Sequence, residues 1–465
     1  MSMSHPQIGS PPRFAAKIGQ QNSAATSAGA WAMVLLLALL PAPLGSVNPL
    51  YWSAAGVVVG LIGVWTFLTS GQLTDWARTS DLKVLGGLFS ALLCFLVIQV
   101  LPVIPTSATT VAGYTFNLAQ ISVVPGQTIL MIVSMATLAA TFLLMARFGG
   151  NEQRRERIYF VLLSVITAYG VYGMFALQTG DHILGLHKWA YEGSVTGTFV
   201  NRNSFATFLA FGAAIAAGLI VGQLHRRAGR DRRDGKVPYN TSNIVVLSVF
   251  YLLLLGALFL TNSRMGLFVA LLATLLAAII GARAIGLAKA IILPGLAFII
   301  VLIGAVVFYG AGTLERLQGV ETDVEIRGAL YKQVWDLIWQ RPLTGFGGGT
   351  FEYAFQLVRQ EPVTVALVWD RAHSTYLGLW ADLGLLAGSI PVLICGYIGW
   401  RLLGMRVTGD RSLAAQVIGL SVLLIGAVHS TVDFSLEIFA VAMMFVALVG
   451  LAFGGYMRTS RSIGR

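Results

Sequence analysis

The strongest constraint on this chain is a series of apolar runs, each about as long as a membrane is thick. A helix that crosses the hydrocarbon core needs roughly 20 mostly apolar residues. Twelve runs fit, at 30–46, 50–70, 83–101, 126–146, 158–178, 203–223, 243–261, 265–282, 290–311, 374–400, 413–430 and 436–456. Charged residues make up only 11% of the 465, against about 25% in a soluble domain. We therefore predict an all-α, polytopic integral membrane protein with about 12 transmembrane helices.

The charges divide unevenly between two alternating sets of connections. The set that includes both chain ends holds 22 of the 31 Lys and Arg but only 7 of the 20 Asp and Glu, with its densest basic cluster at 226–233. Cytoplasmic connections of membrane proteins are enriched in Lys and Arg, so we predict that both termini are cytoplasmic. The net charge of +11 is then an orientation signal and gives no indication of nucleic-acid binding.

This topology divides the chain into five segments. They are a cytoplasmic tail at 1–29, helices 1–9 at 30–311, an outer loop at 312–372, helices 10–12 at 373–456 and a cytoplasmic tail at 457–465. Long connections usually carry function. Within the outer loop, apolar residues at helical spacing over 324–338 predict an amphipathic helix, which Pro342 ends. The glycine-rich segment 344–351 lacks the GK[ST] ending of a phosphate-binding loop, so we predict a tight re-entrant turn there.

Polar clusters stand at the outer ends of several apolar runs. Arg202 lies between Asn201 and Asn203 at the start of the sixth run, and Arg264 follows Asn262 and Ser263 where two runs nearly meet. An arginine at this depth can simply extend toward lipid headgroups. Ionisable residues near the hydrocarbon are nevertheless candidates for function, and both interpretations remain open for Arg202 and Arg264.

Two histidines lie at the same outer boundary. His373 follows Arg371 at the entry to the tenth run, and either a structural or a catalytic role fits a single histidine there. His429 and Asp433 are four residues apart and share a helical face, so a mutual hydrogen bond is the simplest expectation. The alternating acids over 321–325 have no histidine beside them. They indicate a solvated patch, and we predict no metal requirement.

Taken in this order, the motifs resemble those of the O-antigen ligase and polymerase superfamily of bacterial envelope enzymes. The resemblance rests on the long outer loop before the tenth helix and on segments 197–203, 261–266, 327–349, 373–384 and 429–434. It implies an inner-membrane, inverting glycosyltransferase that works on the periplasmic face without metal or cofactor. The implied donor is a glycan on undecaprenyl diphosphate. The implied acceptor is a sugar hydroxyl of lipid A–core or of another lipid-linked glycan, with membrane lipids as further partners.

The resemblance also implies roles for particular residues. It points to Arg202, Arg264, Arg327 and His373. Together with the polar clusters above, we predict catalytic roles for His373, Arg264 and Arg202, and substrate binding by Arg327, Asn201, Asn203, Arg371, His429 and Asp433. Arginine forks bind phosphate bidentately and stay charged, so they can stabilise the leaving diphosphate. A neutral histidine can accept the proton of the acceptor hydroxyl. Asp433 and Glu437 are rival bases, and Asp382 is a weaker one.

Other functions are not excluded by the sequence. A ligase and a polymerase differ only in the acceptor, and the segment 429–434 favours a polymerase slightly. A lipid-linked sugar flippase or another transporter is the alternative class. Such a protein would be expected to carry broken helices, mid-membrane charges or repeated halves, whereas the charges here stand at helix ends.

Overall fold

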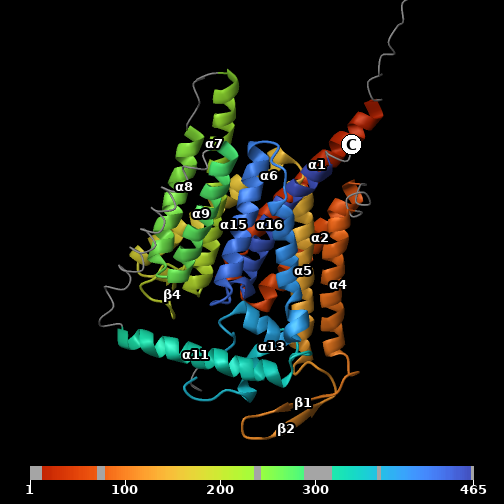
Figure 1. Ribbon diagram of the computed structural model, residues 1–465, viewed down its shortest axis with the longest axis vertical. Coiled ribbons are helices and arrows are strands. Elements are labelled where there is room, and N and C mark those ends of the chain that lie inside the picture. The colour runs from red at the N-terminus through yellow and green to blue at the C-terminus, as the bar shows by residue number, and fades with distance from the viewer. Residues whose placement is uncertain (1–12, 71–78, 235–241, 287–316, 364–367, 462–465) are drawn as a thin grey trace, which may run out of the picture.

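Nine helices in the described part of the chain are long and apolar enough to cross a membrane. The computed structural model describes residues 13–70, 79–234, 242–286, 317–363 and 368–461. The nine helices are α2 (Pro49–Ser70), α4 (Ser80–Val100), α5 (Pro125–Gly149), α6 (Glu152–Gln178), α7 (Arg202–Asp234), α8 (Ser242–Leu260), α9 (Arg264–Ile285), α15 (Asp410–His429) and α16 (Phe439–Arg461). They stand side by side as an upright bundle (Figure 1). A polytopic membrane protein is confirmed. The count of 12 stays a prediction, because the run at 290–311 lies outside the described residues.

The first predicted run, 30–46, is helical only in part. Helix α1 (Arg13–Leu39) begins inside the stretch predicted as a tail, and its apolar part, Thr26–Leu39, is shorter than the other spans. Proline removes a backbone donor and clashes with the preceding turn, so Pro41 and Pro43 end the helix. The chain then turns through a short 3₁₀ helix, η1 (Leu44–Ser46), before α2 begins.

The apolar run predicted over 374–400 is helical, but it is broken rather than continuous. The structure has two shorter helices, α13 (Thr375–Gly388) and α14 (Ile390–Leu403), bent by 69° at their junction. Gly384 interrupts α13 with φ 74°, and a Cβ there would meet the backbone of Leu343. Pro391 then lies in the first turn of α14, where a missing backbone donor costs nothing. As a result α13 packs against helix α11 (Leu317–Gln340), while α14 packs against α15 and α4 of the bundle.

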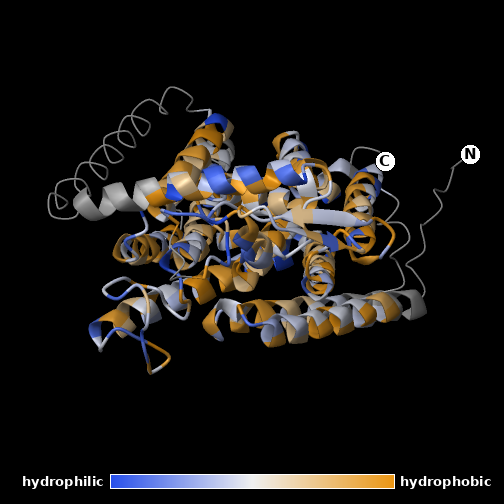
Figure 2. Ribbon diagram, turned by 90° about the horizontal axis from the view of Figure 1, so that it is seen from below, coloured by the Kyte–Doolittle hydropathy of each residue, from blue (hydrophilic) through white to orange (hydrophobic). Residues whose placement is uncertain are grey.

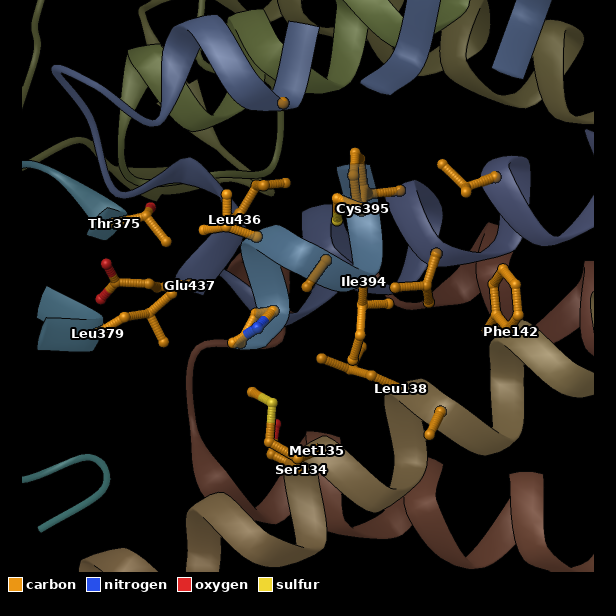
Figure 3. Close-up of a pocket in the computed structure, with 18 of the residues that line it drawn as sticks. Ser134, Met135, Leu138, Phe142, Thr375, Leu379, Ile394, Cys395, Leu436 and Glu437 are labelled. Atoms are coloured by element: carbon orange, nitrogen blue, oxygen red, sulfur yellow. The ribbon is translucent and has the colours of Figure 1, made fainter. Parts of the chain in front are cut away.

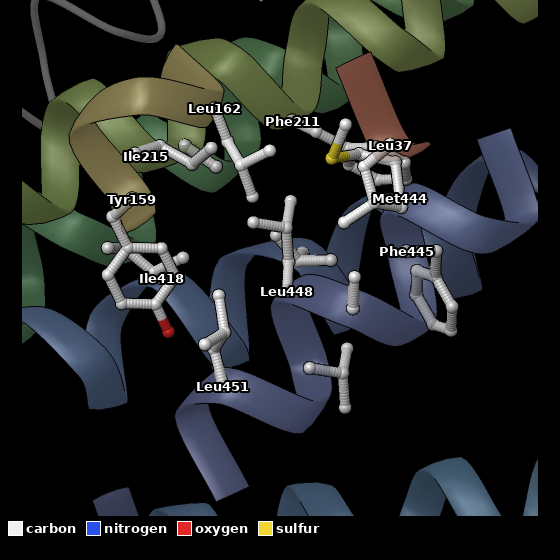
Figure 4. Packing of buried hydrophobic residues seen from close by; sticks show 14 of the residues in the cluster. Leu37, Tyr159, Leu162, Phe211, Ile215, Ile418, Met444, Phe445, Leu448 and Leu451 are labelled. Atoms are coloured by element: carbon white, nitrogen blue, oxygen red, sulfur yellow. The ribbon is translucent and has the colours of Figure 1, made fainter. Parts of the chain in front are cut away.

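The centre of the bundle is formed by α7 and α16, the two most enclosed spans. Phe211 and Ile215 of α7, Ile418 of α15 and Leu448 of α16 meet in the apolar core (Figure 4). Lipid tails are as apolar as leucine, so helices in a membrane associate chiefly through close packing at small residues. Gly454 shows this requirement, since a Cβ at that position would collide with the carbonyl oxygen of Ala146 on α5.

The hairpins, the long helix α11 and several short helices gather at one end of the bundle (Figure 1). They are the hairpins β1–β2 (Thr106–Thr109, Thr115–Leu118) and β3–β4 (His182–Ile183, Leu186–His187), the helices α11 (Leu317–Gln340) and α12 (Phe351–Ala354), and the 3₁₀ helices η3 (Phe355–Leu357) and η4 (Ser435–Glu437). Both hairpins are antiparallel, so the fold is mostly rather than entirely helical.

Helix α11 lies across the end of the bundle, and Figure 2 shows hydrophilic colour along it when viewed from that end. Its buried face carries Leu330, Val334 and Leu337, which confirms the predicted amphipathic helix. The helix ends at Gln340, just before Pro342, as expected. Arg341 ties this end to the β1–β2 hairpin, because its guanidinium group donates hydrogen bonds to the carbonyl oxygens of Ser107 and Ile121.

We expect Gly454→Val to destabilise the protein in detergent, because α5 and α16 would have to separate. Overpacking of a core costs about 1–3 kcal/mol. Gly256→Val on α8 is the matched control, since a Cβ there meets nothing within 4 Å. Thermal unfolding followed by circular dichroism measures the difference. Equal unfolding temperatures for the two variants would contradict the close packing of α5 on α16.

Candidate functional site

Asp433 is the residue that joins the separate parts of the site. It lies between α15 and α16 and is 2% exposed. Its Oδ2 accepts a hydrogen bond of 3.0 Å from Nδ2 of Asn203, and its Oδ1 accepts one from the Ser435 hydroxyl. Its backbone oxygen accepts bonds from the amide and the hydroxyl of Thr375. Asp433 therefore holds the first turn of α7 next to the first turn of α13.

His373 is held in an unfavourable backbone conformation directly before α13. Its φ is 52°, a region that costs a non-glycine residue of order 1–3 kcal/mol and recurs at functional sites. Tyr331 of α11 donates a 2.9 Å hydrogen bond to the His373 carbonyl oxygen. The imidazole ring stands edge-on to Phe434, with centroids 5.1 Å apart, and also to Trp369. Tyr331 thus holds the backbone of His373, while Trp369 and Phe434 hold its side chain.

The surroundings of His373 favour its neutral form. Burial lowers the pKa of the imidazole below its ordinary value of 6.5, and the Arg327 cation lowers it further. The carboxylates of Asp433 and Asp370 oppose this shift without reversing it. A neutral imidazole at neutral pH can accept a proton, so the arrangement suits a general base.

Arg371 and Glu437 form a second charged pair beside the histidine. Nε of Arg371 is 3.5 Å from Oε2 of Glu437, and each side chain is partly buried. Burial raises the pKa of Glu437 to about 7, with the nearby acids Asp433 and Asp370 adding to the shift and the Arg371 cation opposing it. Glu437 is therefore also able to exchange a proton near neutral pH.

Arg202 is the first residue of α7. Asn201 caps the helix, because its Oδ1 accepts a 2.7 Å hydrogen bond from the amide of Asn203. The Arg202 guanidinium carbon lies 5.3 Å from the centre of the Tyr191 ring, in a cation–π arrangement. Tyr191 also receives a hydrogen bond from Nδ2 of Asn201. The loop before α7 thereby positions both side chains.

Arg264 is the first residue of α9, and its side chain is exposed. Ser263 caps this helix by accepting a hydrogen bond from the amide of Gly266. A Cβ on Gly266 would collide with Ala206, so α7 and α9 begin side by side. Arg202 and Arg264 therefore stand at adjoining helix ends. Among the described residues, neither has a hydrogen bond or ion pair with His373.

His429 does not pair with Asp433, contrary to the simplest expectation from their spacing. Its Nδ1 lies 2.5 Å from the Thr207 hydroxyl, and its Nε2 is enclosed without a hydrogen-bond partner. Helix α15 ends at His429, and the turn that follows directs Asp433 toward Asn203 instead. His429 therefore packs against Thr207, which lies one turn after Asn203 on α7.

A large apolar cavity opens beside this polar cluster. It has a volume of about 1110 Å³ and runs between α5, α14, α15 and α16. Figure 3 shows Thr375 and Glu437 at one side of it and Leu138, Ile394 and Phe142 farther along. Arg371 also lines the polar end. The cavity therefore has an ionic mouth, formed by Arg371 and Glu437, and a long wall of apolar side chains.

The glycine-rich segment closes the polar end of this cavity. Gly345, Gly347 and Gly349 have positive φ, which makes the predicted tight turn possible. The amide of Gly349 donates a 2.8 Å hydrogen bond to Oδ2 of Asp382 on α13. Gln99 of α4 donates to the backbone oxygens of both Thr344 and Asp382. The turn thus holds α13 in place, and its backbone amides donate hydrogen bonds to other groups of the protein.

Several residues of the site were not predicted. Tyr331 lies on α11 and Tyr191 in the loop before α7, and their position in the sequence close to predicted polar clusters was an available signal. The ion pair between the buried Lys188 and the partly exposed Asp181, with Nζ and Oδ1 2.8 Å apart, fixes the loop that carries Tyr191. Nothing in the sequence marks Thr207, because it lies in an ordinary apolar run.

No group of three or more His, Cys, Asp or Glu side chains that could hold a metal occurs among the residues described. The acidic side chains over 321–325 lie outside the described set, so the predicted solvated patch stays a prediction. The positive groups near the site are the arginines named above.

This arrangement defines a multi-pass membrane protein with a polar site at one end of its bundle. Residues 249–392 match the O-antigen ligase family model, and this match confirms the resemblance to the O-antigen ligase superfamily. It supports an enzyme that transfers glycans in the general manner of O-antigen ligases. The matched segment contains Arg264, Arg327 and His373 but not Asp433. No curated protein matches the chain.

The bond between Asn203 and Asp433 predicts a measurable coupling in stability. A hydrogen bond to a charged group contributes about 1.5–3 kcal/mol. We expect a double-mutant cycle of Asn203→Ala and Asp433→Ala, followed by thermal unfolding, to give a clearly non-zero interaction energy. Thr431→Ala, in the same turn but exposed, replaces Asp433→Ala in the control cycle. Additive effects in the first cycle would contradict the link between α7 and this turn.

Proposed function

We propose that the protein transfers a glycan from a polyprenyl diphosphate, such as undecaprenyl diphosphate, to a sugar hydroxyl at this site. The acceptor is lipid A–core in a ligase or a second lipid-linked glycan in a polymerase. The site would face the periplasm of a bacterial inner membrane, with both termini cytoplasmic, as the charge distribution predicts. The transfer would invert the anomeric carbon in a single displacement and would use no metal.

The observation that carries this proposal is the apolar cavity with an ionic mouth. A lipid-linked donor has a hydrocarbon chain that must stay out of water and a diphosphate that must not enter hydrocarbon. The cavity wall of Leu138, Phe142 and Ile394 suits the chain, and Arg371 at the mouth suits the diphosphate. His373 follows Arg371 by two residues, so a headgroup there would lie beside the proposed base.

In this proposal the arginines supply the positive charge that a metal ion would otherwise provide. As the glycosidic bond breaks, the leaving diphosphate gains negative charge, and fixed cations stabilise it without reorganising. Arg202 and Arg264, at adjoining helix starts, are the proposed ligands of this charge. Arg327, beside His373, is proposed to bind the same headgroup and to hold the imidazole neutral. Asn201, Asn203, His429 and Asp433 are proposed to shape the substrate site.

Arg264→Lys should lose most transfer activity even though the charge is kept, because lysine cannot form a bidentate fork with phosphate. Loss of one or two charge-assisted bonds predicts a fall of roughly 10- to 100-fold. The assay uses purified protein in vesicles with a polyprenyl-diphosphate glycan and separates the products by chain length. Arg283→Lys, at the far end of the same helix, is the control.

Near wild-type turnover of Arg264→Lys would exclude this role for the arginine. Transport of the donor across the vesicle without any new glycosidic bond would instead favour a flippase. Strict dependence of transfer on magnesium would contradict the metal-independent mechanism.

The dependence of activity on pH distinguishes the two possible bases. If His373 is the base, activity falls as pH drops through its pKa. Arg327→Gln removes a cation that lowers this pKa, so the acid limb should move to higher pH. Arg371→Gln removes the cation that lowers the pKa of Glu437, and it should move the limb upward only if Glu437 is the base. A shift with Arg371→Gln alone would therefore exclude His373.

A further inference from the structure

The apolar cavity does not end in the middle of the bundle. Its wall on α5 extends from Gln127, near the polar site, to Arg147 in the last turn of the helix. At 1.5 Å per residue these two positions are about 30 Å apart along the helix, which matches the thickness of a hydrocarbon core. The opposite wall ends at Leu403 of α14. The cavity thus reaches the end of the bundle remote from His373.

Arg147 differs from five nearby arginines at this remote end. Those five have oxygen partners, namely Arg154 with the Phe148 carbonyl, Arg155 with the Gly149 carbonyl, Arg401 with Asp81, Arg411 with Glu156 and Arg458 with the Gly150 carbonyl. Nε of Arg147 is enclosed by protein and has no hydrogen-bond partner. Among the described residues no acid forms an ion pair with it. Leaving a buried donor of a charged group unpaired is costly, so an anionic partner for Arg147 would be favourable.

A second cation near Arg147 makes a negatively charged partner more favourable still. The guanidinium group of Arg154 lies close enough to Arg147 for the two cations to repel each other. The wall next to Arg147 is apolar and includes Leu143, Leu144 and Leu82. A ligand that completes this site must therefore carry negative charge at one end and hydrocarbon at the other. Basic pockets between transmembrane helices select lipids of this kind.

We propose that Arg147 binds the phosphate of an anionic phospholipid from the leaflet at this end, with an acyl chain of that lipid lying against Leu82, Leu143 and Leu144 at the remote end of the cavity. Two parallel hydrogen bonds from the arginine fork to the phosphate would satisfy Nε. This lipid site is separate from the polar cluster around Asp433, and it does not depend on glycan transfer. If the predicted orientation holds, the lipid comes from the cytoplasmic leaflet.

Native mass spectrometry of the full-length protein, delipidated in detergent and titrated with phosphatidylglycerol, tests this site. We expect bound phosphatidylglycerol on the wild-type protein and about tenfold weaker binding for Arg147→Gln, as loss of charge-assisted bonds predicts. Arg147→Lys should fall between the two, because it keeps charge without the fork. Arg157→Gln is the matched control, since it removes the same charge from an exposed position outside the cavity wall.

A second variant keeps the test valid if Arg147→Gln does not fold. Leu143→Trp, one turn before Arg147 in the cavity wall, retains the arginine and should weaken phosphatidylglycerol binding by filling the space for the chain. Equal weakening by Arg157→Gln would indicate attraction to surface charge only and would overturn the proposal. Unchanged binding in both Arg147→Gln and Leu143→Trp would overturn it as well. Displacement of the lipid by equimolar inorganic phosphate would show a free-phosphate site and would also contradict a lipid site.

Discussion

The hydrogen bonds of Asp433 connect parts of the chain that are far apart in sequence. Its carboxylate accepts from Asn203 at the start of α7, and its backbone oxygen accepts from Thr375 at the start of α13. A buried carboxylate needs such partners, because desolvating it without them is costly. Once this residue is satisfied, the arginine at the start of α7 and the turn that carries His373 have fixed relative positions. Thr375, which lines the cavity, is held by the same contacts.

The site also reflects two different environments, the hydrocarbon region around the bundle and the more polar surroundings at the end of the bundle. In the hydrocarbon region, backbone groups must be paired internally, and helices approach closely only at small residues such as Gly454. At the end of the bundle, loops can hold charged groups and strained backbone, including the positive φ of His373. An apolar cavity that opens at this boundary can hold an amphipathic substrate with each part in a suitable environment.

Much of the helical framework could be predicted from the sequence, because the length of an apolar run directly reports a membrane span. The amphipathic pattern over Leu330 to Leu337 likewise predicted the helix across the end of the bundle. The bend between α13 and α14 was missed, since apolar content continues through Gly384 and Pro391 and only backbone geometry interrupts it. Polar residues at run ends could be identified as candidates. The contacts between these residues could not be predicted, because the hydrogen bond from Asn203 to Asp433, for example, joins residues 230 positions apart in the sequence.

Photoaffinity labelling with a polyprenyl diphosphate that carries a diazirine in its chain tests the central claim most directly. If the chain lies in the cavity and its diphosphate at the mouth, cross-links should map to α5 and α14 near Leu138 and Ile394. Unlabelled polyprenyl diphosphate should compete, and Arg371→Gln should reduce the yield. Labelling confined to outward-facing residues such as Leu252 of α8, unaffected by the competitor, would contradict the proposed binding of a lipid-linked donor.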